Sequence, residues 1–374
     1  MNAPTALFRD LLQEIIELVS IGQVFTDIHI EQDMPMMVKT PRKWQSMNAE
    51  PVQREEMIPL LNAIDLEWEE KIASGAIDRS FLLTQCRLRC NVYYSGSREK
   101  ITIAIRRLPL HPISMEKTGL PLYVRSILEA TRGIILVTGP TGSGKTTTIA
   151  AMLDYFNSTR SGHIITIEEP IEYLLERKQS IISHKEVPTD TASFSSGLRE
   201  AMRQNPDILM VGEIRDFDTA DTLLHAGESG HLVLATMHTN SAVSALSKLL
   251  AFFGPEQRNQ RAVALASSLI GVISQTLVPT ETGDALTLAS ELLFNNHQQI
   301  ANLIADAEKF HMLADFMKRK EDNMSRSLNE SLAQLVAKKT ISAKDAMRAA
   351  YNRAELHDTL SGMRIVPSGT AGST

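Results

Sequence analysis

A glycine-rich segment near the middle of the chain has the residue types and the spacing of a phosphate-binding loop. Residues 139–146 match the pattern G-x-x-x-x-G-K-[ST]. The preceding residues 133–138 are apolar and strand-like, and residues 147–156 are compatible with a helix. Backbone N–H groups and the dipole at the start of such a helix can hold phosphate oxygens. The candidate nucleotide-binding residues are Gly139, Pro140, Thr141, Gly142, Ser143, Gly144, Lys145, Thr146 and Thr147.

Two side chains of this loop have specific chemical roles. Lys145 would reach the β- and γ-phosphates, and the Thr146 hydroxyl would ligate Mg²⁺. The alternative is a chance glycine-rich turn, which the complete match and its flanking segments disfavour. The sequence therefore predicts a chain that binds ATP together with Mg²⁺.

Carboxylates follow two further strand-like segments. Glu213 comes just after the apolar run 208–211, where phosphate-loop ATPases place an acid that acts on Mg²⁺ or on the attacking water. Glu168, Glu169 and Glu172 lie together after another apolar strand. Three acids this close indicate either a functional site, which is a cation site or a polarised water, or a solvated strand end. The pattern alone leaves these two alternatives open.

A histidine ends a fourth strand-like run. His238 follows residues 232–236 and lies among hydroxyl and amide side chains. A single histidine in such a place is more often a structural hydrogen-bonding residue than a catalyst. His238 is therefore a candidate catalytic residue, with the structural alternative open.

Composition narrows the class of protein. The 374 residues are 43% hydrophobic and 22% charged, as in ordinary globular proteins. The net charge of −6 and the 5% of aromatic residues do not favour nucleic-acid binding. We expect no signal peptide, and no membrane span, because no apolar run approaches about 18 residues. Cys86 and Cys90 are expected to be reduced, buried thiols on one strand face.

The pattern of apolar residues divides the chain into regions. Residues 1–107 are predicted to be an α+β domain, with helices at 1–20 and 52–73 and a hairpin of strands at 87–94 and 100–107. Strands are also expected at 26–31 and 36–39. Beyond a proline-containing linker, strands and helices alternate as in a parallel sheet covered on both faces. The expected regions are a linker at 108–120, an α/β core at 121–290, a helical region at 291–360 and a disordered tail at 361–374, with mostly helix from residue 245 onward.

Four segments in this order resemble the secretion-ATPase superfamily, and within it the PilT-type motors that retract type IV pili. They are similar to the family's Walker A motif, Asp box, Walker B motif and His box, and the resemblance extends from about residue 8 to 355. The four segments are residues 139–146, 165–172, 205–215 and 230–239.

The resemblance implies a fold and a set of site residues. The fold is a RecA-like P-loop ATPase domain with an N-terminal PAS-like α+β domain and a C-terminal helical bundle, assembled as a homohexamer. Glu213 corresponds to the catalytic glutamate, and Glu168 and Glu172 take catalytic roles in the Asp box. Glu169 replaces the usual aspartate and is expected to help hold Mg²⁺ with Thr146. His231 and His238 match the two His-box histidines.

The N-terminal hairpin resembles the segment that carries the family's arginine fingers. Arg89 and Arg106 are expected in those roles. An arginine on a preceding domain can reach phosphates when that domain closes. The alternative is that both are ordinary residues on a strand surface.

Other segments indicate whether the motor would extend or retract a pilus, and which proteins it would bind. The chain has none of the C-x-x-C pairs common in extension and type II secretion ATPases. Residues 299–304 resemble a helix associated with retraction, with Ala301 in place of an arginine. The implied partners are an inner-membrane pilus platform protein, contacted at the cytoplasmic face, and a paralogous pilus ATPase, with no direct contact with lipid or nucleic acid. A type IVb or plasmid pilus motor, a Dot/Icm-like secretion ATPase and a DNA-translocating ATPase remain alternatives.

Overall fold

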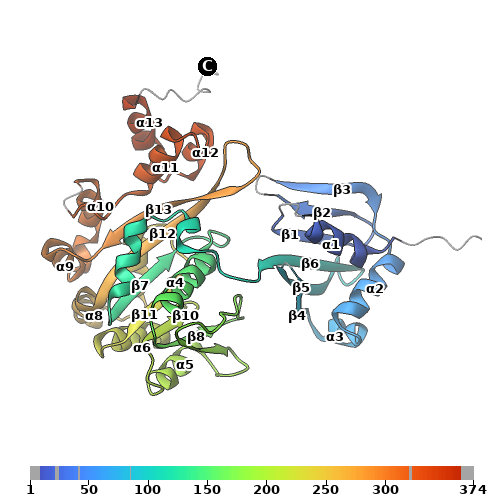
Figure 1. Ribbon diagram of the computed structural model, residues 1–374, viewed down its shortest axis with the longest axis horizontal. Coiled ribbons are helices and arrows are strands. Elements are labelled where there is room, and N and C mark those ends of the chain that lie inside the picture. Colours follow the sequence, from blue (N-terminus) through green and yellow to red (C-terminus); the bar gives the residue numbers. More distant parts are fainter. Residues whose placement is uncertain (1–8, 22–24, 41–42, 85, 320–321, 364–374) are drawn as a thin grey trace, which may run out of the picture. The chain divides into compact units, whose positions relative to one another are not determined.

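In the computed structural model the chain forms two compact units (Figure 1). The first consists of the residues up to Leu110 together with Thr282–Ala285, and the second of His111–Glu281 and the residues from Leu286 on. Among the described residues, no helix combines the length and the apolar composition needed to cross a bilayer. Most of the predicted tail, from residue 364 on, lies outside the described part of the chain. The structure describes residues 9–21, 25–40, 43–84, 86–319 and 322–363.

The first unit is a six-stranded antiparallel sheet with three helices packed against one face. Its strand order is β3-β2-β1-β6-β5-β4. The expected hairpin and the two expected early strands are confirmed, whereas β3 and β4 were not predicted and the single expected helix at 52–73 is two. The elements are α1 (Leu11–Ser20), β1 (Asp27–Glu31), β2 (Pro35–Lys39), β3 (Trp44–Pro51), α2 (Arg54–Ile64), α3 (Trp68–Ser74), β4 (Ile77–Leu82), β5 (Cys86–Ser95) and β6 (Lys100–Pro109).

Both cysteines lie on the helix-covered face of β5. They are buried and unbridged, as expected. Burial raises the pKa of the Cys90 thiol to about 12. These thiols therefore serve as small apolar core residues.

The second unit is built on a seven-stranded sheet with the order β13-β12-β7-β11-β10-β8-β9. All neighbouring pairs are parallel except β12 with β13. Because parallel strands end at the same edge, the loops that follow β7, β8, β10 and β11 gather there. These loops carry the four segments singled out in the sequence. The strands are β7 (Gly133–Thr138), β8 (His163–Glu168), β9 (Ile181–Glu186), β10 (Ile208–Val211), β11 (Leu232–Met237), β12 (Leu269–Pro279) and β13 (Leu286–Phe294).

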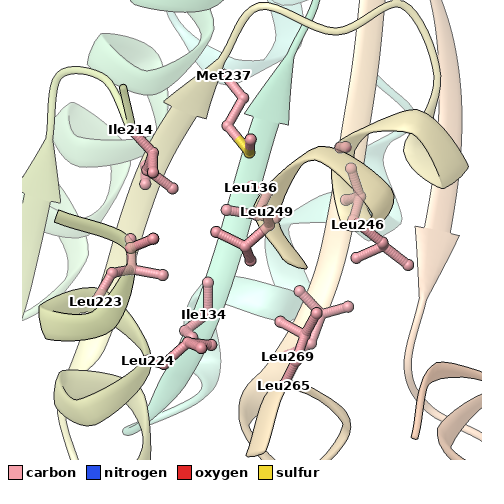
Figure 2. Close-up of a cluster of buried hydrophobic side chains, with 14 of the residues drawn as sticks. Ile134, Leu136, Ile214, Leu223, Leu224, Met237, Leu246, Leu249, Leu265 and Leu269 are labelled. Carbon is pink, nitrogen blue, oxygen red and sulfur yellow. The ribbon is translucent and has the colours of Figure 1, made fainter. Parts of the chain in front are cut away.

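Helices cover both faces of this sheet. Along β7, Ile134 and Leu136 point into one core and Ile135 and Val137 into the other. Figure 2 shows the first core, where Ile134 and Leu136 lie among leucines of the covering helices. Burial on both faces holds the strand ends, and hence the loops, in fixed positions. One face carries α5 (Phe194–Ala201), α6 (Phe217–Glu228), α7 (Ala242–Ala251), α8 (Pro255–Ser268), α9 (Gln298–Ile304) and α10 (Phe310–Arg319), and the other carries α4 (Lys145–Thr159) with the 3₁₀ helices η1 (Met115–Thr118) and η2 (Leu122–Glu129).

The region after residue 245 is mostly helical, as expected, but it also contains two strands that were not predicted. The long strands β12 and β13 lie in this region and extend the central sheet. Their runs are apolar without a clear alternation, and such a run does not distinguish a buried strand from a buried helix. β13 also passes through residue 290, where the expected helical region was to begin. Beyond it, α11 (Leu328–Ala337), α12 (Ala343–Ala349) and α13 (Arg353–Gly362) pack around a smaller core with Val278 and Ala289.

Candidate nucleotide-binding site

The loop between β7 and α4 is shaped by glycines. Gly139, Gly142 and Gly144 have φ values of +151°, +79° and +85°. A Cβ on Gly139 would lie 2.4 Å from both the Gln275 carbonyl oxygen and the Ser143 Oγ. Glycine at this position therefore lets the loop pack directly on β12, with Gly144 preceding the first residue of α4.

Lys145 lies inside the curve of this loop. Its Nζ donates to the carbonyl oxygens of Gly139, at 2.9 Å, and Pro140, at 3.1 Å. Burial lowers the pKa of Lys145, while the carboxylates of Glu213 and Glu172 oppose that shift. The ammonium is thus held where the loop's backbone N–H groups converge at the helix start.

Strand β12 contacts two of the loops at this edge of the sheet. Gln275 Nε2 donates to the Ser143 carbonyl oxygen at 2.7 Å. The neighbouring Ser274 Oγ donates to the Asn240 carbonyl oxygen at 3.0 Å. Gln275 follows Ser143 by 132 positions, and nothing in the local sequence indicated this contact. One strand therefore positions both the phosphate loop and the loop that contains His238.

His238 bridges the loop lysine and the candidate catalytic glutamate. Its Nδ1 lies 3.4 Å from Lys145 Nζ, and its Nε2 lies 3.3 Å from Glu213 Oε1. An ammonium only donates, so Nδ1 accepts and Nε2 carries the hydrogen that faces Glu213. Burial and the nearby Lys145 lower the pKa of His238, which favours this neutral form.

Arg215 connects the carboxylates of two loops. Its Nε donates to Glu213 Oε2 at 2.7 Å, and its Nη1 donates to Glu169 Oε2 at 2.6 Å. Hydrogen bonding to Glu213 raises the pKa of Arg215. A continuous row therefore runs from Lys145 through His238, Glu213 and Arg215 to Glu169, and it holds Glu213 by both oxygens. The sequence did not single out Arg215, although a cation two positions after a strand-ending glutamate was an available signal.

Glu168 lies deeper than Glu169. It is 6% exposed and shares a small cavity with Thr146 and Tyr173. The Glu172 backbone N–H is 3.5 Å from Glu168 Oε2, and Tyr173 Oη lies 3.0 Å from Thr147 Oγ1. Thus Glu168 is the acid beside Thr146, whereas Glu169 is paired with Arg215. The expectation that Glu169 helps hold Mg²⁺ stays a prediction.

The loop fits a phosphate ligand. Ser143 is 3% exposed, and its Oγ has no hydrogen-bond partner among the described residues. An unpaired buried hydroxyl in a positively charged, glycine-lined curve is satisfied by a phosphate oxygen. Thr146 and Glu168 supply the hard oxygen donors that Mg²⁺ prefers. Within the described ranges, no group of three or more His, Cys, Asp or Glu side chains is arranged to hold a metal ion.

A family model described as "Type II/IV secretion system protein" matches residues 98–351. The chain belongs to this family. The type IV pilus retraction ATPase PilT of Pseudomonas aeruginosa is 34% identical over 342 residues, covering 90% of this chain and 98% of that relative. The uncharacterised protein YggR of Escherichia coli is 36% identical over 312 residues, covering 81% of this chain and 91% of that relative.

Solved structures agree with this assignment. The crystal structure of the pilus retraction motor PilT with bound ADP has a TM-score of 0.79 and 37% identity, covering 94% of this chain and 99% of that one. The ATPase DotB of Legionella pneumophila has a TM-score of 0.81 at 23% identity, covering 93% and 97% of the two chains, and shows the fold alone. The fold of this family member is thus the mixed α/β fold of PilT.

The two expected arginine fingers lie in the first unit of this family member, whereas the phosphate loop belongs to the second. They are cross-strand neighbours on β5 and β6. Arg89 donates to both carboxylate oxygens of Asp78, and Arg106 donates to Asp27 Oδ1 at 3.0 Å. The two guanidinium groups share the sheet face opposite the helices, and their role stays a prediction.

The two His-box histidines are separated by a whole strand. His231 directly precedes β11 and His238 directly follows it. His231 Nδ1 lies 3.2 Å from Ser229 Oγ, at the sheet edge opposite the phosphate loop. Only His238 of this pair belongs to the row of side chains at the candidate site.

Proposed function

We propose that this protein is a Mg²⁺-dependent ATPase motor that powers the retraction of type IV pili. The observation that carries the proposal is its likeness to PilT along nearly the whole length of both chains. The row of side chains from Lys145 to Glu169 supports it, because it places a lysine and an acid at the sheet edge where nucleotides bind. We assign the second unit as RecA-like, the first as PAS-like and the last helices as a bundle.

The site residues have distinct tasks in hydrolysis. The loop and Lys145 bind the phosphates of ATP, and Thr146 with a nearby acid would hold Mg²⁺, which supplies positive charge against the phosphate oxygens. His238 and Arg215 orient Glu213. Glu213 accepts a proton from the water that attacks the γ-phosphorus, as the bond to the ADP oxygen breaks.

Arg89 and Arg106 belong to a different unit from the phosphate loop, and this leads to a proposal about assembly. We infer a homohexamer in which these arginines complete a site when the first unit closes on ATP, within a subunit or between neighbours. Light scattering should give the mass of six chains. When a non-hydrolysable ATP analogue is added, closure of the first unit should change the angle between residues 1–107 and 121–360. A strict monomer at micromolar concentration in both conditions would contradict the assembly.

Mixing two inactive variants tests where the arginines act. Arg89→Ala subunits mixed with Glu213→Gln subunits should regain part of the ATPase activity if a neighbour supplies Arg89, because some sites then combine an intact arginine with an intact glutamate. No recovery in mixed rings would place Arg89 in its own subunit's site.

The motor is proposed to act at the cytoplasmic face of the inner membrane, on a pilus platform protein, with a paralogous ATPase as a further partner. Deleting the gene should leave cells with as many pili as before or more, but unable to withdraw them, as seen by imaging labelled pili. Restoring the wild-type gene should restore retraction. Cells that lose their pili would indicate an extension motor, and normal pili with failed protein export would indicate a secretion ATPase.

A further inference from the structure

We propose that His184 is a positioning residue of the ATPase site, which fixes the Glu168 carboxylate and the loop after it against Thr146. His184 lies on β9, the edge strand of the sheet, where the register places it opposite Thr166 of β8. The inference rests on the proposed ATPase function, because it assumes a role for Glu168 in catalysis.

Both ring nitrogens of His184 are engaged. The Leu175 backbone N–H donates to Nε2 at 3.2 Å. A nitrogen that accepts a hydrogen bond carries no hydrogen, so the ring hydrogen is on Nδ1. Nδ1 lies 2.8 Å from Thr166 Oγ1 and 3.4 Å from Glu168 Oε1. These contacts fix the orientation of the ring and direct its N–H toward the hydroxyl and the carboxylate.

The Glu168 carboxylate depends on such donors because it is buried. A carboxylate removed from water is costly unless protein groups replace its hydration. The N–H of His184 faces Oε1, and the Glu172 backbone N–H lies 3.5 Å from Oε2. Without the imidazole, Oε1 loses this neighbouring donor, and the carboxylate is free to turn away from Thr146.

The same ring also fastens the acid-bearing loop. The imidazole accepts the backbone N–H of Leu175, which lies just after the segment that contains Glu169 and Glu172. The side chains of Thr146, Glu168 and His184 line one small cavity. One imidazole therefore sets both the orientation of Glu168 and the path of the loop beside the phosphate-binding residues.

A second histidine on the same strand pair provides a matched control. His163 begins β8, and its ring contacts Ser183 Oγ at 2.9 Å and the Gln204 carbonyl oxygen at 3.1 Å. Like His184, it therefore links β8 to β9, but His163 lies at the other end of β8 from Glu168. If a lower kcat came only from weakened pairing of β8 with β9, it would appear in both the His163 and the His184 variants.

The test separates turnover from nucleotide binding. His184→Ala should lower kcat at least about 10-fold, the usual scale for losing an orienting partner, with affinity for a fluorescent ATP analogue nearly unchanged. His184→Gln should recover most of the activity, because its amide can accept from Leu175 through oxygen and donate toward Glu168 through nitrogen. His163→Ala should retain kcat close to that of the wild type.

The coupling between His184 and Glu168 is read from the double variant. If His184 acts largely through Glu168, the losses caused by His184→Ala and Glu168→Gln should overlap, so the double variant should lose clearly less kcat than the product of the two single losses. Fully multiplicative losses, a wild-type kcat in His184→Ala, no recovery by His184→Gln, or equal losses in His184→Ala and His163→Ala would each overturn the inference. Full activity of Glu168→Gln would show that Glu168 has no role in catalysis, which is a failure of the proposed site. Reduced activity of Glu168→Gln together with a wild-type kcat in His184→Ala would contradict only the role of His184.

Discussion

Glu213→Gln is expected to abolish most ATP turnover while leaving nucleotide binding intact. The amide keeps the size of the side chain and can still accept one of its two hydrogen bonds, from Arg215 or from His238, but it cannot take a proton from water. Losing a general base slows turnover by about 10²-fold or more, which corresponds to about 2.7 kcal/mol of lost transition-state stabilisation. Steady-state phosphate release and titration with a fluorescent ATP analogue measure the two quantities separately.

The control for this variant is another glutamate of the same unit. Glu228 is exposed at the C-terminal end of α6, so Glu228→Gln removes a charge without touching the row of side chains that ends at Lys145. It should hydrolyse ATP like the wild type. A wild-type rate in Glu213→Gln would instead exclude Glu213 as the base, and equal losses in both variants would indicate an effect of net charge.

Gly139→Ala should weaken nucleotide binding. The added Cβ would meet a backbone carbonyl oxygen of β12 and the Ser143 Oγ, each at 2.4 Å, so the loop must move off the strand. We expect the dissociation constant of an ATP analogue to rise by at least ~10-fold, because strain of this kind costs of order 1–3 kcal/mol. Thermal unfolding of the variant shows whether the loss is confined to the loop.

Gly142→Ala is the control that separates the steric clash at Gly139 from the cost of a positive φ in alanine. Gly142 also has a positive φ, of +79°, but a Cβ there meets nothing within 4 Å. Both variants therefore carry the cost of a left-handed alanine, and only Gly139→Ala carries the clash. Equal affinities in the two variants would contradict the explanation based on close packing against Gln275.

The sequence was informative where function depends on the ends of parallel strands. Lys145, Glu213 and His238 each follow a buried, β-branched run, and a parallel sheet brings the ends of such runs to one edge. Their meeting in one row could therefore be predicted before their contacts were known.

Contacts between distant segments could not be predicted in this way. Arg215 reaches Glu169, 46 positions away, and Gln275 reaches Ser143, 132 positions away. Such pairs depend on which strands are neighbours, and a single sequence does not state that order. His184 was missed for a further reason: edge strand β9 has intermediate burial and no strong apolar alternation, so the sequence did not indicate a strand there.

The position of β12 has a mechanical consequence. Ser274 and Gln275 attach this one strand to the histidine loop and the phosphate loop, and β13 pairs with it from Gly271 to Pro279. On the far side, the Ser290 N–H of β13 donates to Ser331 Oγ of α11. A force along β12 would act on all of its hydrogen bonds to β13 at the same time. We therefore expect β12 to resist such a displacement as one unit with β13, and to pass a movement of the phosphate loop on to the last helices.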